Sequence, residues 1–436
     1  LSLRQALRAW LAMAKEAHRR EYGGDYLILR SKEPLWHPPP ELLERISPRP
    51  MQWLERERGA LVASVRQAAQ FGFDELCWDL ALTVVTLFEA NSYFDDWRYT
   101  TQTALTLVRR EANSRGLAAM LYSLGSLCIF DLQPDAALES LKPALQLFTK
   151  HGDSPGRALV LRNLAFVDSL RGDLKESFSK YEEAVEVFRS VGDRVGEAHV
   201  LSNMARTLLD GGDYVEAEKL LTSALGIVRE AGSKRLEAQV RYRLGEAALQ
   251  QGQLDNAGRA FAWALRIVRD NGDHIGEAYA LCGLGRVCAG EGQREQAQMT
   301  FGQSLTLACQ IGERLVEGRV RYELGELDIT SGRIPEGIKR LTEAMDIYRH
   351  LGLGPSQAMV LVALTEAHDA TGAAEAAEET ARLAWNLLIG QDSVEARRLR
   401  DRLALRAKPA YPSTRDTDAG TFLAGPARGS GRRPGS

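Results

Sequence analysis

Residues whose types could do chemistry are scattered through this sequence rather than grouped. The chain of 436 residues has seven histidines and five cysteines, and none of the cysteines forms a CxxC pair. A structural zinc site needs cysteines or histidines at short spacing, and cysteines this scattered do not make a disulfide framework. We therefore expect no metal site, and we interpret Cys282 and Cys288 as small packing residues.

The sequence also lacks two common motifs for nucleotide binding and for hydrolysis. No GxxxxGK[ST] phosphate loop and no HExxH motif occurs in the sequence, although these are common signatures of nucleotide hydrolysis and of zinc proteases. The stretch Gly283-Leu284-Gly285 lacks the third glycine of a dinucleotide-binding loop and falls within a predicted helix, which favours a role in helix packing. The sequence therefore predicts a protein that is not an enzyme, with no catalytic residue and no cofactor bound to this chain.

Composition and charge argue against two further classes. The 55 Lys and Arg residues nearly balance the 58 Asp and Glu residues, for a net charge of −3, whereas a dedicated nucleic-acid binder usually carries a strong basic excess. No apolar run reaches the 18 residues that suggest a membrane-spanning helix. The N-terminal stretch LSLRQALRAWLAMAKEAHRR has the spacing of an amphipathic helix rather than of a signal peptide. We predict a cytoplasmic protein that binds neither nucleic acid nor membrane, and, since it begins with Leu1 inside that helix, part of a longer chain.

The dominant pattern is a repeat of 40 residues. Glycine recurs in two series half a period apart: Gly72, Gly152, Gly192, Gly232, Gly272, Gly312 and Gly352, and Gly172, Gly212, Gly252, Gly292, Gly332 and Gly372. Small residues keep the same register at Ala144, Ala184, Ala224, Ala264, Ser304, Ala344 and Ala384, and large ones at Leu141, Tyr181, Leu221, Phe261, Phe301 and Leu341. A repeated unit that cannot bury both of its faces alone must stack on its neighbours.

Each period contains two predicted helices. In the unit that starts at Gly192, they cover about 195–209 and 215–229, joined by a turn at 210–213. Glycine fits at each helix end because it adopts the left-handed conformation at little cost. The aspartates that follow glycine are expected to cap the next helix, and four prolines fall in predicted first turns: Pro134, Pro155, Pro335 and Pro355. Pro143 lies inside a helix and should kink it.

The equivalent positions of successive repeats, which we call columns, carry residues that resemble the pattern of the tetratricopeptide repeat (TPR) family. The resemblance rests on Leu-Gly pairs such as Leu244-Gly245 and Leu284-Gly285, and on a small residue at Ala217, Ala257 and Ala297. It implies an all-α fold, a right-handed superhelical solenoid of about eight 40-residue helix-turn-helix repeats with a helical N-terminal flank. The first two repeats are degenerate, with Ser92, Ala112 and Leu132 at glycine positions.

The resemblance also places a row of polar and aromatic residues on the concave surface. In TPR solenoids that surface is lined by the first helix of each repeat, so the binding candidates are Arg162, Asn163, Phe166, His199, Asn203, Arg206, Tyr242, Arg243, Glu246, Tyr279, Arg286, Tyr322 and Glu326. Arginine and asparagine could hold an extended peptide or an anionic group. The alternative is that these residues bond to one another between repeats, which the alternation of Arg and Glu would suit.

The array is expected to divide the chain into four parts. Residues 1–71 form a helical arm and linker, with a GGDY loop, an irregular proline-rich connector between Pro34 and Pro50, and a helix from about Met51 to Gln70. The solenoid covers 72–391, a capping helix 392–406, and a disordered tail 407–436.

Several strings in the first half resemble the C-terminal region of large actinobacterial regulators, the AfsR-like SARP (Streptomyces antibiotic regulatory protein) activators of the STAND type. They include ALRAWLAMAKEAHRREYGGDY, FEANSYFDDWRYT and LRNLAFVDSLRGDL. In that family a DNA-binding domain and a nucleotide-binding ATPase domain precede the TPR region, so ATP or ADP is expected only in a domain outside this chain. The resemblance implies a signal-sensing, protein-interaction module of a transcriptional regulator. Its partners would be a peptide, protein or small-molecule effector in the groove and its own upstream domains. The alternative is a structural TPR adaptor that forms an oligomer or docks a fixed partner.

Overall fold

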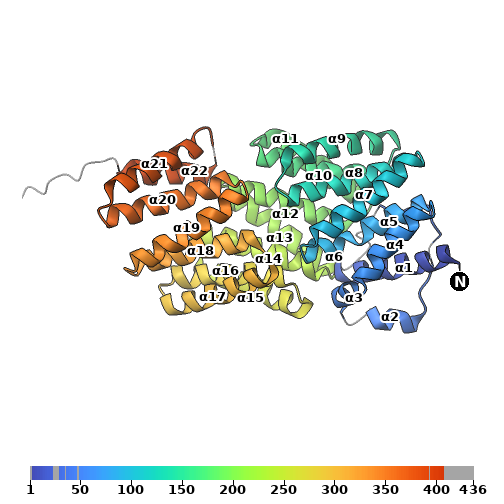
Figure 1. Cartoon of the computed structure of the whole chain (residues 1–436), viewed down its shortest axis with the longest axis horizontal. Coiled ribbons are helices and arrows are strands. Elements are labelled where there is room, and N and C mark those ends of the chain that lie inside the picture. Colours follow the sequence, from blue (N-terminus) through green and yellow to red (C-terminus); the bar gives the residue numbers. More distant parts are fainter. Residues whose placement is uncertain (1, 23–28, 35, 47–48, 392, 407–436) are drawn as a thin grey trace, which may run out of the picture.

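The computed structural model describes residues 2–22, 29–34, 36–46, 49–391 and 393–406, and these residues form 22 helices and no strand (Figure 1). The N-terminal flank contains four helices: α1 Leu3–Tyr22, α2 Pro40–Ile46, α3 Pro50–Arg56 and α4 Arg58–Gln70. In the first repeat the first helix is broken at Val84 into α5 Asp74–Thr83 and α6 Val85–Ala90, and the second helix is α7 Phe94–Arg110.

Seven regular helix pairs follow, one for each remaining period of the sequence. The first helices are α8 Ser114–Phe130, α10 Ser154–Leu170, α12 Arg194–Gly211, α14 Lys234–Gln250, α16 His274–Gly290, α18 Arg314–Thr330 and α20 Gly354–Ala370. The second helices are α9 Pro134–Lys150, α11 Leu174–Ser190, α13 Tyr214–Glu230, α15 Leu254–Asn271, α17 Arg294–Ile311, α19 Ile334–His350 and α21 Ala374–Leu388. The chain is thus an all-α solenoid of about eight TPR-like repeats, as the 40-residue period predicts.

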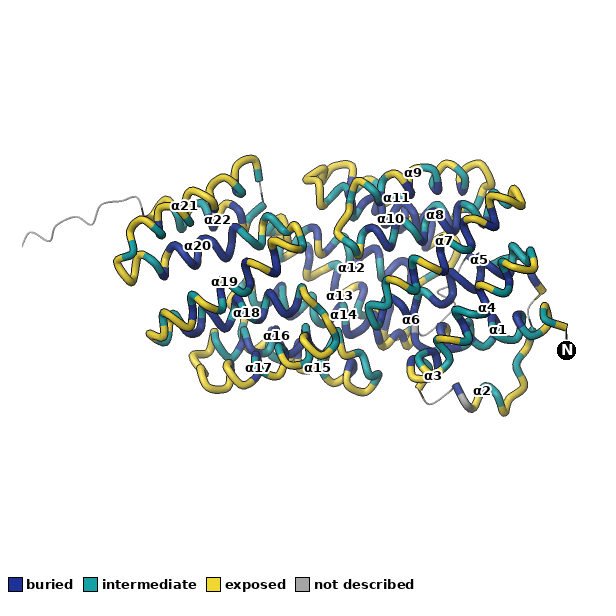
Figure 2. The backbone as a smooth tube through the Cα atoms, viewed as in Figure 1, coloured by how far each residue is buried: buried dark blue, intermediate teal, exposed yellow. Residues whose placement is uncertain are grey.

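The stack curves with its first helices on the inner side. Neighbouring first helices such as α14 and α16 approach one another more closely than neighbouring second helices do. Figure 2 shows the consequence: α10 and α20 are buried over most of their length, whereas the outer helices α9, α17 and α21 expose one side. The first helices therefore carry the concave surface, with one row of side chains facing inward.

The helix ends confirm the register of the repeats. Gly152, Gly172 and the glycines in equivalent turns all have positive φ. Ser92, Ala112 and Leu132 take the same left-handed conformation with φ of 56°, 55° and 58°, although a side chain makes it unfavourable by about 1 kcal/mol or more. The degenerate first repeats therefore keep the backbone of the regular ones.

Capping residues also follow the predictions, with one exception. Asp153, Asp193, Asp213 and Asp273 each accept a hydrogen bond from a backbone N–H of the first helical turn, at 2.8–3.2 Å. Asp173 makes no such bond, so the prediction is wrong there. The four prolines predicted at helix starts do lie in first turns, while α9 continues through Pro143 to Lys150.

Packing between the two helices of a repeat depends on the small and large columns. Phe301 is fully buried, and a side chain at Gly285 would place its Cβ 2.5 Å from the Phe301 ring. Only glycine allows that approach, so the prediction that Gly283 and Gly285 serve helix packing is confirmed. The small column is buried as well, and Ser304 donates its hydroxyl to the carbonyl of Ala278.

Two predictions about the N-terminal flank are wrong. The helix expected over 51–70 is interrupted at Glu57, which ends α3 and precedes α4. The connector expected to be irregular contains the short helix α2. The GGDY loop and the tail 407–436 lie outside the described residues.

Both flanks reach the middle of the solenoid. The helix α1 packs on α5 and contacts α14, four repeats along the chain. The last helix, α22 Val394–Arg406, packs on α20 and α21 and also contacts α12 (Figure 1). Within the described residues, no helix is both long and apolar enough to span a membrane.

Candidate functional site

The residues predicted to line the concave surface all lie on first helices. Arg162, Asn163 and Phe166 belong to α10, and equivalent positions of α12, α14, α16 and α18 carry the others. The structure brings them together along the inner side of five consecutive repeats, and their individual contacts differ between the two ends of that row.

On α10, the polar residues are buried and bonded to the preceding repeat. Arg162 donates to the hydroxyl of Tyr122 at 2.9 Å, and Asn163 donates to Ser126 Oγ at 2.8 Å. Arg162 also donates to Asn163 Oδ1 at 3.3 Å. These two residues connect α10 to α8, so they serve the stacking of repeats.

Arg243 makes an equivalent connection one helix pair further on. It donates to Ser202 Oγ at 2.6 Å and to Asn203 Oδ1 at 3.2 Å, both on α12. Burial, together with the charge of Arg206, lowers the pKa of Arg243 to about 10. The guanidinium remains charged near neutral pH and adds a positive potential to this part of the surface.

Arg206, between these two, is exposed and differently placed. Its guanidinium lies 4.8 Å from the centre of the Phe166 ring, a cation–π contact along the concave surface. Among the described residues, no carboxylate lies within ion-pair distance of it, while Asp210 acts on it only at longer range. Its N–H groups are therefore open to a ligand.

His199 lies beside this arginine cluster. Burial, and then the charges of Arg162 and Arg243, hold its pKa well below the usual value. The imidazole is therefore neutral near pH 7 and can donate one hydrogen bond and accept another.

Aromatic residues continue the row on α14 and α16. The Tyr242 ring lies 5.7 Å from Tyr279 in an edge-on arrangement and 5.4 Å from Phe261. Burial raises the pKa of both tyrosines above the ordinary value, so both keep their hydroxyl protons. Such a pair offers a flat apolar contact with polar tips.

The C-terminal end of the row is a ladder of ion pairs. Arg286 lies between Glu246, at 2.6 Å, and Glu323, at 3.3 Å. Arg319 also pairs with Glu323, at 2.9 Å. Tyr322 donates to Glu326 at 3.3 Å. At this end of the row, the acidic and basic side chains pair with one another.

Two sets of residues were missed by the sequence reasoning. Tyr122 and Ser126 stand one period before Arg162 and Phe166, so the same columns extended into the degenerate repeat could have found them. Arg402 on α22 binds Glu366 at 2.5 Å and approaches Glu326 at 3.9 Å. It lies 40 residues after Val362, in the column of Arg162 and Tyr322, so the same register extended past the array could have found it.

The expectation that the sequence has no GxSxG motif is wrong, because residues Gly152 to Gly156 form this pattern. A hydrolase elbow with this pattern follows a strand. Here Gly152 and Asp153 form the turn between α9 and α10, and Ser154 is an exposed residue of the first turn of α10. Its surroundings fit a helix cap rather than a nucleophile.

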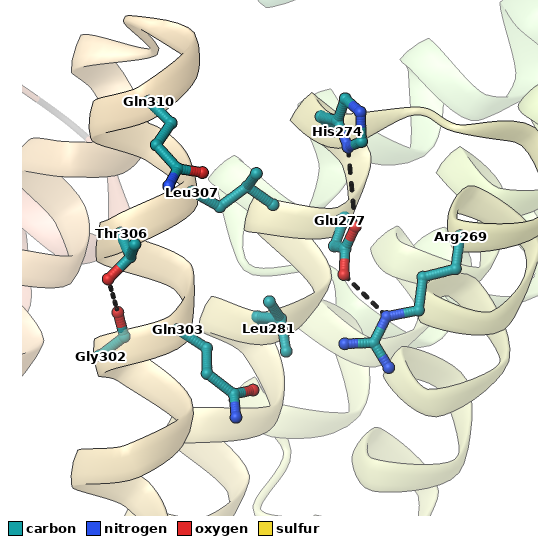
Figure 3. A pocket seen from close by; sticks show the side chains of 9 residues that line it. All are labelled: Arg269, His274, Glu277, Leu281, Gly302, Gln303, Thr306, Leu307 and Gln310. Carbon is teal, nitrogen blue, oxygen red and sulfur yellow. Dashed lines mark hydrogen bonds and ion pairs between the residues drawn. The ribbon is translucent and has the colours of Figure 1, made fainter.

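An open pocket of about 550 Å³ lies between α15, α16 and α17 (Figure 3). Leu281 and Leu307 form its apolar part, and Glu277 pairs with Arg269 at 2.7 Å and faces His274 at 3.8 Å. Gly302 leaves room, because no atom lies within 4 Å of where its Cβ would be. No sequence pattern predicted this pocket, which involves the outer helices α15 and α17 as well as α16.

Comparison with known proteins supports the repeat assignment. The tetratricopeptide repeat family matches residues 156–230 and 236–310. Among curated proteins, none matches this chain.

Solved structures with the same fold include two bacterial regulators. A Rap protein complexed with competence and sporulation factor has 16% identity and a TM-score of 0.55, over 80% of this chain and 99% of its own. The apo quorum sensor NprR from B. thuringiensis has 17% identity and a TM-score of 0.55, over 77% and 97%. These similarities show the fold.

A third similar structure is larger. It is a signal transduction ATPase with numerous domains (STAND) that carries a TPR sensor, from Pyrococcus horikoshii. The identity is 12% and the TM-score 0.50, and the match covers 93% of this chain but only 63% of that protein. The chain thus contains tetratricopeptide repeats in a solenoid similar to those of sensor and regulator proteins.

Proposed function

We propose that this chain is the sensing and protein-interaction portion of a multidomain transcriptional regulator, and that its concave surface binds a peptide or a protein segment. The finer assignment, to the AfsR-like SARP activators of the STAND type, rests on the sequence resemblance. It places the DNA-binding and nucleotide-binding domains before residue 1 of this chain. The STAND ATPase of similar fold carries a TPR sensor, which supports the association of such a solenoid with a nucleotide-binding domain.

One observation carries the proposal: the concave surface holds an exposed arginine with no carboxylate of the described residues in ion-pair contact. Arg206 stacks on Phe166 and points no N–H group at a carboxylate. The charge of Arg206 acts on the hydroxyl of Tyr279, which packs edge-on against Tyr242, and Asn203 lies one turn before Arg206 on α12. Amide and guanidinium groups beside aromatic rings are suited to an extended peptide with polar or anionic side chains. A Rap protein of similar fold is known in complex with the Phr* peptide.

Binding along this surface would act on the whole solenoid. A ligand that touches α10, α12 and α14 together favours one curvature of the stack, because neighbouring repeats share their interfaces. Differential affinity for two curvatures is what couples a ligand to a distant domain. In the regulator, that coupling would control the upstream domains.

The test uses the full chain and a display library of short random peptides. Selected peptides should bind with an affinity that falls about tenfold or more in Arg206→Glu. The control is Arg259→Glu, an exposed arginine on the outer helix α15. If no peptide is enriched, or if the two variants bind alike, the proposed function is wrong.

The structural adaptor is favoured by a different observation. Arg162, Asn163, Arg243 and Arg286 are engaged in bonds between repeats, which gives these residues a structural reason to be present. An adaptor would form a dimer that persists on dilution in light scattering, with a concave surface that selects no peptide.

A further inference from the structure

The last helix, α22, begins 40 residues after α20 and takes the place of a further first helix at the end of the stack. Glu326 and Glu366 follow Arg206, Glu246 and Arg286 in one column with a spacing of 40 residues. Arg402 of α22 donates to both oxygens of Glu366, at 2.9 and 2.5 Å, and approaches Glu326 at 3.9 Å. The helix therefore covers the C-terminal end of this column, whereas Arg206, near the other end of the column, is exposed.

The charges of the two partners are complementary. The helix VEARRLRDRLALR has five arginines and two acidic residues, hence a net charge of 5 − 2 = +3. Besides Arg402, Arg406 binds Asp369 at 2.6 Å. Glu326, Glu366 and Asp369, which we call the acidic strip, thus hold two arginines one helical turn apart.

The helix is held mainly by exposed contacts, together with hydrogen bonds from Arg400 to the carbonyl oxygens of Leu388 and Gln391 at 2.8 and 2.7 Å. Only Ala396 and Leu399 are buried among its residues, and Leu405 is 66% exposed. The side chains of the Arg402–Glu366 pair are 27% and 49% exposed, and ion pairs this exposed stabilise little. A segment with so few buried contacts opens locally at low cost.

The first turn of α22 reaches across to another repeat. Val394 lies so close to Gly212, in the turn between α12 and α13, that a Cβ there would be 2.5 Å from Val394 Cγ2. The helix thus bridges α20 and α12, and its release would free both the acidic strip and this turn.

We propose that the acidic strip is a docking site for an arginine-bearing helix of a partner protein, and that α22 occupies it until the partner displaces it. The partner helix would carry the pattern that α22 presents at Leu399, Arg402, Leu403 and Arg406, which is Leu-x-x-Arg-Leu-x-x-Arg. The two arginines match the carboxylates, and the two leucines match the apolar contact of α22 with α20. The inference deepens the proposed function, since it names a partner chemistry for one end of the same surface.

The test uses the full chain and a fluorescent peptide with the sequence of residues 394–406, measured by anisotropy at low salt. The variant Arg402→Glu/Arg406→Glu repels its own α22, and it should bind the peptide at least about tenfold more tightly than the unmodified chain. The matched control is Arg397→Glu/Arg398→Glu, which makes the same charge change at two exposed positions of α22 and should leave the strip closed.

A charge exchange completes the design. The variant Glu366→Lys/Asp369→Lys should bind a peptide that carries Glu at the two arginine positions, but not the original peptide. Combining all four substitutions restores the internal pairs, so neither peptide should bind. Circular dichroism and thermal unfolding confirm that each variant is folded.

Two results would overturn the proposal. One is equal binding of the original peptide to the unmodified chain and to Arg402→Glu/Arg406→Glu. The other is a dimer of the unmodified chain that this double substitution abolishes, because the occupant would then be the α22 of a second copy. Peptide selection that depends on Arg206 and peptide binding that depends on Glu366 are separate readouts, so either can fail alone.

Discussion

In the C-terminal half of the concave surface, Arg286 and Arg319 both pair with Glu323, whereas in the N-terminal half Arg206 stacks on Phe166 with no carboxylate in contact. Arg206 and Arg286 occupy the same column, two repeats apart. A column position therefore does not by itself decide whether an arginine stabilises the stack or is open to a ligand. The residues that the neighbouring repeats present to it decide.

The two ends of the solenoid differ in a related way. At the N-terminal end, α1 contacts α14, and its buried His18 and Glu21 both feel the charge of Arg235 on α14. His18 also contacts Thr86 on α6. At the C-terminal end, α22 is held by half-exposed ion pairs. Buried polar groups respond to protonation, and exposed pairs respond to salt, so different conditions should loosen the two ends.

The largest effect is expected where the ion-pair ladder is broken. Arg286→Ala leaves Glu246 and Glu323 without their shared partner in a poorly solvated position, so the free energy of unfolding should fall by about 2 kcal/mol. Urea unfolding measures it. Arg382→Ala is the control, since Arg382 and its partner Glu379 are exposed on α21. An equally small change in both variants would show that the ladder is not structural.

The second-largest effect is expected at low pH, which should weaken the packing of α1 against the solenoid. Burial, followed by the charges of Arg235 and Lys15, lowers the pKa of His18 to about 3. Because the unfolded histidine has a pKa near 6.5, the neutral ring contributes fully above that pH, and its contribution is lost as pH falls toward 3. From pH 6.5 to 5.5 the loss should be about 1 kcal/mol.

Hydrogen exchange of the α1 amides, corrected for the intrinsic rate, measures this loss. His18→Gln cannot take up the proton and should show a flatter pH dependence than the unmodified chain. Parallel pH profiles would mean that another group controls the contact.

Salt should weaken the ion pairs of α22 at the C-terminal end of the solenoid. Raising NaCl from low to high concentration screens the pairs of Arg402 and Arg406, so the exchange protection of α22 should fall by up to about 1 kcal/mol. The protection of α1 should change less. The comparison between the two ends is wrong if both helices respond equally.

The smallest effect on stability is expected at Arg206. Arg206→Ala removes an exposed cation–π contact, which is worth about 0.5–1 kcal/mol. The same substitution should abolish the binding of selected peptides. A loss of stability as large as that of Arg286→Ala would place Arg206 in the stack rather than in a binding surface.

Much of the fold was predictable from the spacing of residues, because each repeat makes most of its contacts within itself and with its neighbours. The glycine series predicted the turns, and the structure shows that the degenerate positions Ser92, Ala112 and Leu132 also adopt positive φ. The break at Glu57 and the short helix α2 were not predictable, because the N-terminal flank contains no repeat and so has no equivalent positions to compare. The candidate surface was predictable as a set of positions, because the columns put them on first helices.

What the sequence by itself determined is the solenoid and the identity of the residues along its inner side. Only the tertiary structure decided which of those residues remain open, because that depends on partners far along the chain. Arg162 is engaged by Tyr122, 40 residues before it, and Glu366 by Arg402, 36 residues after it on the last helix. Periodicity fixes contacts between equivalent positions, but the contacts of α1 and α22 with the middle of the stack follow from the curvature accumulated over several repeats, which no single repeat contains.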